Sequence, residues 1–111
     1  MNALDIRGHL VSLDDEGFLA DLNEWSEPVA LALAQREGIE LTPDHWQILA
    51  LLRAFYAQYQ LSPATRPLVK YAALHLGPEK GNSSYLNRLF NGTPAKLAAK
   101  LAGLPKPTNC I

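Results

Sequence analysis

The sequence TPDHWQILALLRAFYAQY, Thr42–Tyr59, is the segment around which the rest of the chain is organised. Thr42 is typical of a helix N-cap, Pro43 of the first helical position, and Asp44 places an acid in the first turn. The apolar and aromatic positions that follow are His45, Ile48, Leu49, Leu52, Phe55, Tyr56 and Tyr59. Their spacing of three and four residues predicts an amphipathic helix, which we expect at the centre of the core.

Similar start signals predict four more helices. A small polar residue stands at each start, usually with a proline next to it, and a glycine follows most of the ends. The predicted starts are Ser26-Glu27-Pro28, Ser62-Pro63, Gly81-Asn82-Ser83 and Thr93-Pro94. The last of these helices runs to about Ala102, and Gly103 caps it.

The first twenty residues have a different pattern. Apolar and polar residues alternate over 3–6 and 9–13, and 18–20 offers a third short run. Arg7-Gly8 and residues 14–17 supply turns between these runs. The pattern predicts a small antiparallel β-meander, which needs a helical layer to pack on. We therefore expect an α+β protein that is mostly α.

Length and composition restrict the function. A chain of 111 residues predicts one domain, and a net charge of −1 with a pI near 6.3 argues against a nucleic-acid binder. No apolar run is long enough to span a membrane, and residues 1–6 do not resemble a signal peptide. A single cysteine is typical of a reducing cytoplasm, and three scattered histidines predict no metal site. We expect a cytoplasmic protein with no metal and no cofactor.

The C-terminal residues 103–111, GLPKPTNCI, contain the only cysteine, Cys110, one residue from the end. A glycine and two prolines separate it from the last helix, which predicts a semi-rigid, exposed arm. From position alone, two interpretations stay open. Cys110 is either an incidental surface cysteine or a nucleophile that is presented to other proteins.

Positive charge near a cysteine favours its reactive thiolate, and would also stabilise a persulfide anion. The candidate supporting cations are Lys106, Lys100, Lys96 and Arg88, with Lys80 as a further possibility. Lys96 and Lys100 are four residues apart and share a helix face. The alternative is that these lysines form an ordinary solvated face.

Two other functions find less support. A cysteine–histidine enzyme would need a positioned base, but His45 and His75 are interpreted as buried core histidines. The two helices around residue 61 are compatible with a helix-turn-helix in which Arg66 and Lys70 touch DNA. An ordinary helical hairpin gives the same spacing, and the net charge favours that interpretation.

Several motifs of this chain occur together, in the same order, in one known family. They are Trp25-Ser26-Glu27-Pro28, Leu41-Thr42-Pro43-Asp44-His45-Trp46, Ser62-Pro63-Ala64-Thr65-Arg66, Leu68-Val69-Lys70, Gly81-Asn82-Ser83-Ser84-Tyr85-Leu86, Arg88-Leu89-Phe90 and the tail Gly103-Leu104-Pro105-Lys106-Pro107 with Cys110. On these motifs the chain resembles the DsrC/TusE family over nearly its whole length. The resemblance implies a β-meander over 1–20, an orthogonal array of about five helices over 24–102 and a flexible arm over 103–111. It also implies sulfur carriage as a persulfide on Cys110.

One position separates the branches of this family. DsrC, the partner of dissimilatory sulfite reductase, has a second cysteine where this chain has Ala99. The single cysteine resembles the TusE-type branch, which implies a sulfurtransferase that acts as a persulfide carrier. The implied donor is a TusBCD/DsrEFH-type complex, and the implied acceptor is an MnmA-type tRNA 2-thiouridylase acting on the wobble uridine. No direct membrane contact is implied, and Asn91-Gly92-Thr93-Pro94 departs slightly from the usual family turn.

Two alternatives are retained. One is a DsrC-like partner or regulator in sulfite and sulfur metabolism. The other is a helix-turn-helix binding module in which Cys110 senses the redox state.

Overall fold

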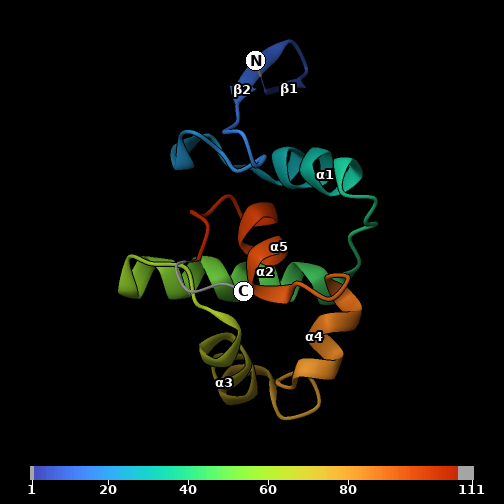
Figure 1. The fold of residues 1–111 in the computed structure, drawn as a ribbon, viewed down its shortest axis with the longest axis vertical. Helices are drawn as coiled ribbons and strands as arrows, with labels where there is room; N and C mark the ends of the chain where they lie inside the picture. The colour runs from blue at the N-terminus through green and yellow to red at the C-terminus, as the bar shows by residue number, and fades with distance from the viewer. Residues whose placement is uncertain (1, 108–111) are drawn as a thin grey trace.

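The longest axis of the molecule measures 41 Å, with a β-hairpin at one end, helices in the middle and two further helices at the other end (Figure 1). The computed structural model describes residues 2–107. The elements are β1 (Ala3–Ile6), β2 (His9–Ser12), the short 3-10 helix η1 (Leu22–Glu24), α1 (Glu27–Arg36), α2 (Pro43–Tyr59), α3 (Thr65–Leu76), α4 (Ser83–Leu89) and α5 (Pro94–Leu101). This order confirms the predicted α+β class with five helices. No helix among the described residues has the length and apolarity that crossing a bilayer requires.

The N-terminal sheet is a two-stranded antiparallel hairpin in which Ala3 lies opposite Ser12 and Ile6 opposite His9. The third predicted strand is reduced to a single bridge between Leu13 and Leu19. The carboxylate of Asp14 explains this, because it accepts hydrogen bonds from the backbone N–H groups of residues 16 and 18. These bonds hold the segment as a turn and leave little chain for a longer strand.

α2 begins at Pro43, as predicted. The N–H of Thr42 donates to Nδ1 of His45 at 3.1 Å, so the ring proton lies on Nε2, which donates to the carbonyl of Leu89 at 2.8 Å. His45 is buried with both ring nitrogens bonded, and its interpretation as a core histidine is confirmed. The same interpretation is wrong for His75, which is exposed and stacks on Tyr71.

The start of α3 differs from the prediction. Ser62 and Pro63 are buried and precede the helix, which begins at Thr65. The hydroxyl of Ser62 donates to the carbonyl of Pro105, 2.6 Å away, and is therefore not used as a helix cap. The hydroxyl is used by a residue 43 positions further along the chain. The local sequence around Ser62 therefore could not show where α3 begins.

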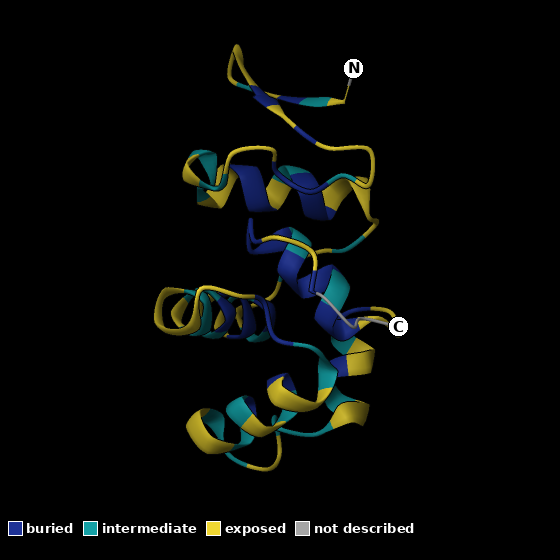
Figure 2. Ribbon diagram, turned by 60° about the vertical axis from the view of Figure 1, so that its left-hand side comes forward, coloured by how far each residue is buried: buried dark blue, intermediate teal, exposed yellow. Residues whose placement is uncertain are grey.

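The centre of the core is α5, and the longer α2 lies beside it. α5 packs against each of the other four helices, and Figure 2 shows it as the most deeply buried one. Its alanines explain the close approach, because small side chains allow neighbouring helices near the backbone. The fully or almost fully buried alanines are Ala95, Ala98, Ala99 and Ala102. Of the stripe predicted on α2, His45, Ile48, Leu49 and Leu52 are buried, whereas Phe55 and Tyr56 are half-buried and Tyr59 is exposed. The second half of the predicted stripe is therefore wrong as a core face.

Candidate functional site: the base of the C-terminal arm

The arm leaves α5 through a defined helix cap. Gly103 has φ +74°, its N–H donates to the carbonyl of Lys100, and the next N–H, of Leu104, donates to Ala99 at 2.9 Å. These two bonds form a Schellman motif, in which glycine takes the left-handed position at little steric cost. The side chain of Leu104 is buried. The direction of the chain after α5 is therefore fixed by the cap.

Trp25 and Arg53 hold the last turn of α5 from outside. The indole Nε1–H of Trp25 donates to the carbonyl of Leu101 at 2.9 Å, and Nη1 of Arg53 donates to Ala102 at 2.7 Å. The Arg53 guanidinium also lies 4.0 Å from the centre of the Trp25 ring, a cation–π contact. Carbonyls that a helix end leaves unpaired are thus satisfied by side chains of residues far away in sequence.

Partial burial lowers the pKa of Arg53 below its usual value, because the charged form loses hydration. Two open hollows border this side chain. One, of about 460 Å³, lies between residues 20–23, Tyr56 and Leu104, and the other, of about 560 Å³, lies beside Trp25 and Trp46. Arg53 therefore places a positive charge beside the start of the arm. Its guanidinium donates to the carbonyl of Ala102 and lies over the indole of Trp25.

The next residues of the arm also lie on the body. Pro105 accepts the hydrogen bond from Ser62, Pro107 is buried, and Nζ of Lys106 lies 3.0 and 3.2 Å from the two carboxylate oxygens of Glu16. The described part of the predicted arm, 103–107, is therefore attached at several points. Cys110 lies outside the described residues, and its role stays a prediction.

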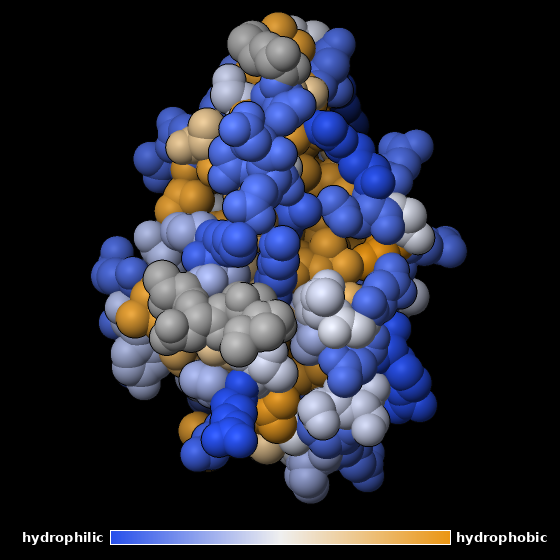
Figure 3. Space-filling view, viewed as in Figure 1, coloured by the Kyte–Doolittle hydropathy of each residue, from blue (hydrophilic) through white to orange (hydrophobic). Residues whose placement is uncertain are grey.

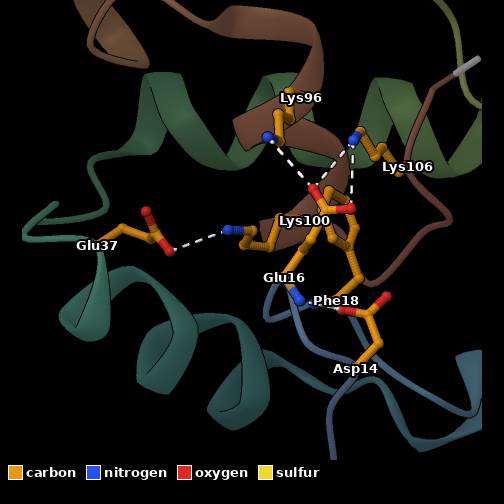
Figure 4. Close-up of polar contacts among 7 residues, drawn as sticks. All are labelled: Asp14, Glu16, Phe18, Glu37, Lys96, Lys100 and Lys106. Carbon is orange, nitrogen blue, oxygen red and sulfur yellow. Dashed lines mark hydrogen bonds and ion pairs between the residues drawn. The ribbon is translucent and has the colours of Figure 1, made fainter.

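The predicted supporting lysines gather on one side of α5, as Figure 4 shows, but each has a carboxylate partner. Lys96 and Lys106 share Glu16, with Nζ–oxygen distances of 3.4 and 3.0 Å, and Lys100 pairs with Glu37 at 3.1 Å. The hydrogen bond from Lys106 is the main reason why the pKa of Glu16 falls below its usual value; partial loss of hydration opposes this shift, and the charges of Lys106 and Lys96 add to it. We call Glu16, Glu37, Lys96, Lys100 and Lys106 the seam, because their ion pairs join α5 and the arm to the turn at residues 14–17 and the end of α1.

Arg88 lies elsewhere, on the exposed face of α4, and among residues 2–107 it takes part in none of these ion pairs. Lys80 pairs with Asp44 at 3.3 Å. Within the same part of the chain, no three His, Cys, Asp or Glu side chains are placed to hold a metal ion. The structure thus brings together three of the four predicted cations.

Arg53 and Glu16 were not among the site residues predicted from the sequence. Arg53 offered a signal, since it is the one charged residue within the apolar stripe that follows His45. Glu16 offered none, because its partners lie 80 and 90 residues further along the chain.

These features define a small α+β protein whose helices hold the segment that follows α5, residues 103–107, on the body. The sequence profile of the family described as "DsrC like protein" matches residues 5–111. The chain belongs to this family. It is 50% identical to sulfurtransferase TusE of Escherichia coli (strain K12) over 108 residues, which cover 97% of this chain and 99% of the relative.

Further members of the family match this chain over nearly its full length. Sulfurtransferase TusE of Salmonella typhimurium is 51% identical over the same share of each chain. The solution structure of Allochromatium vinosum DsrC matches with a TM-score of 0.90 at 45% identity, over 99% of this chain and 98% of that one. The oxidized DsrC subunit of the dissimilatory sulfite reductase of Archaeoglobus fulgidus matches at 0.86 and 42% identity, over 99% and 100%.

Proposed function

We propose that this protein is a sulfur-relay carrier that accepts sulfane sulfur as a persulfide on Cys110 and passes it to an acceptor enzyme. The observation that carries the proposal is 50% identity to sulfurtransferase TusE over nearly the full length of both chains. The family match extends to residue 111 and therefore includes Cys110.

The transfer is an exchange at sulfur. The Cys110 thiolate attacks the outer sulfur of a donor persulfide, a new S–S bond forms, and the bond within the donor persulfide breaks. The donor cysteine leaves as a thiolate, and Cys110 holds the outer sulfur with its proton. An acceptor thiolate then attacks the outer sulfur of the Cys110 persulfide, and Cys110 leaves as a thiolate, so no outside oxidant or reductant is consumed.

The proposed donor is a TusBCD/DsrEFH-type complex, and the proposed acceptor is an MnmA-type tRNA 2-thiouridylase, which places the carrier in wobble-uridine thiolation. The identity to TusE supports this branch. The position Ala99 supports it too. A lone thiol has no internal partner, so its sulfur must go to another protein.

A DsrC-like role in sulfite metabolism is the second candidate, favoured by the two DsrC structures at 42 and 45% identity. It would have to operate without an intramolecular disulfide, because Cys110 is the only cysteine. Binding to a dissimilatory sulfite reductase with no effect on tRNA thiolation would favour this candidate.

The proposal is tested by loading. The protein is incubated with a persulfide donor, the excess is removed, and the intact mass is measured with Cys110→Ser as the control. We expect the wild-type chain to gain the mass of one sulfur atom and to pass it to an MnmA-type acceptor. Equal gain by Cys110→Ser, or no gain by the wild type, would refute a carrier function of Cys110.

A further inference from the structure

The small net charge hides a strong separation of charge along the chain. Residues 1–44 contain ten acidic and two basic residues, a net charge of −8. Residues 45–111 contain one acidic and eight basic residues, a net charge of +7. In Figure 1 the hairpin and α1 form one end of the molecule, and α3 and α4 form the other. Most of the acidic residues thus gather at the end formed by the hairpin and α1, whereas Arg66, Lys70 and Arg88 lie on α3 and α4 at the other end.

Ion pairs use four of the eight basic residues of 45–111. Lys80, Lys96, Lys100 and Lys106 all pair with carboxylates of the first 44 residues. Arg66 and Lys70 lie on the exposed face of α3 and form no ion pair within residues 2–107. Because no acid occurs between residues 45 and 78, this face keeps its positive charge.

The same face carries exposed apolar side chains. Leu74 on α3 is 78% exposed, Leu61 before α3 is 54% exposed, and Tyr59 is 49% exposed. Tyr71 joins them, since its ring packs on Phe55, which in turn packs on Tyr59. We call the set Tyr59, Leu61, Arg66, Lys70, Tyr71 and Leu74 the α2–α3 surface. Over α3, Figure 3 shows hydrophobic atoms directly beside strongly hydrophilic ones.

The arm passes the edge of this surface. Leu61 is followed by Ser62, whose hydroxyl holds the carbonyl of Pro105. Cys110 is three residues beyond the buried Pro107, and three residues of chain span at most about 11 Å. A protein that exchanges sulfur with Cys110 must therefore dock close to the point where Pro107 meets the body.

We propose that the α2–α3 surface is the docking site for the proteins that exchange sulfur with Cys110, and that they offer it an apolar pocket with an acidic rim. This inference rests on the proposed carrier function. Charge complementarity identifies the rim, because a surface without acids attracts carboxylates. The exposed leucines indicate that the partner is a protein. Nucleic acids are bound mainly by cations and stacked aromatic rings and make little use of aliphatic side chains.

The test uses Leu74→Glu, with Leu31→Glu as its matched control. Leu31 is 51% exposed on α1, at the acidic end, so both changes place a carboxylate at an exposed leucine. Each variant is titrated with a purified TusBCD-type donor complex and with a purified MnmA-type acceptor. For at least one partner we expect Leu74→Glu to weaken binding by about tenfold or more, as for a residue at the centre of an interface, and Leu31→Glu by less than about twofold.

Lys70→Glu provides an independent variant, expected to weaken binding and to flatten its dependence on salt. Unchanged affinity of both Leu74→Glu and Lys70→Glu for both partners would overturn the docking site. Loss of tRNA binding with protein binding intact would assign the surface to nucleic acid instead. A dimer that Leu74→Glu disrupts in sedimentation would assign it to a second copy of this chain.

The failure of this inference differs from the failure of the carrier function. Loading of Cys110 by a small-molecule persulfide does not require docking, and we expect it to be equal in all variants. If Cys110 does not load, the carrier function fails, whereas normal loading with unchanged affinities refutes the docking site alone.

Discussion

Replacing Gly103 by alanine should loosen the base of the arm by a mechanism that can be isolated. A Cβ atom at this position would overlap Cδ1 and Cγ of Trp25, far inside van der Waals contact. The backbone φ of +74° adds strain of its own. Trp25 must therefore move, and its hydrogen bond to Leu101 and its contact with the guanidinium of Arg53 are lost or weakened.

The magnitude follows from these parts. An L-residue in the left-handed region costs about 1–2 kcal/mol. Loss of the indole hydrogen bond costs about 1 kcal/mol, and loss of the cation–π contact about 0.5–1 kcal/mol. We expect Gly103→Ala to lower the free energy of unfolding by about 3 kcal/mol, a large fraction of the stability of a domain of this size.

Gly38→Ala is the matched control. Gly38 follows α1 in the same type of cap, with φ +73°, and a Cβ there would meet no atom within 4 Å. It should cost only the backbone strain, about 1–2 kcal/mol. Urea unfolding followed by tryptophan fluorescence measures both variants. Equal losses for Gly103→Ala and Gly38→Ala would refute the role given to Trp25.

Two further predictions concern the same region. Arg53→Lys should lower the free energy of unfolding by about 1–2 kcal/mol, because an ammonium group cannot both stack on the indole and donate to the carbonyl as the planar guanidinium does. Arg66→Lys, on the exposed face of α3, is the control. It should change the free energy of unfolding by less than about 0.5 kcal/mol in the same urea experiment. Because Lys106 lowers the pKa of Glu16, the ion pair should be present above the usual carboxyl pKa of about 4.3 and be lost only as pH falls through the lower value in the folded protein. In an NMR pH titration, the amide resonance of Lys106 should shift with the protonation of Glu16, and this shift should be absent in Glu16→Gln. A midpoint at or above about 4.3 would contradict the pairing.

Local signals explain what the sequence predicted correctly. Ser26, Thr42 and Pro94 mark helix starts because their effect depends only on the residues that follow within one turn. Gly103 was assigned as a cap for the same reason. The resemblance to a known family extended these local assignments to a whole fold, which the structure confirms.

The remaining features depend on contacts across the fold. Ser62 has the sequence of a cap, but its hydroxyl is taken by Pro105. The stripe of α2 suggested the centre of the core, whereas the short alanine-rich α5 occupies it because all its neighbours can approach closely. The lysines near the tail were expected to serve the thiol, and their partner Glu16 lies in a turn that no pattern connects to them.

Opposite charges at opposite ends of a body 41 Å long give this protein a large permanent dipole moment. An approaching acidic surface exerts a torque on such a dipole before any side chains touch, within roughly the Debye length of about 8 Å at physiological salt. The collision then begins with α3 facing the partner, so a larger share of encounters is productive. Added salt should accordingly slow association much more than it speeds dissociation, although the net charge of the chain is only −1.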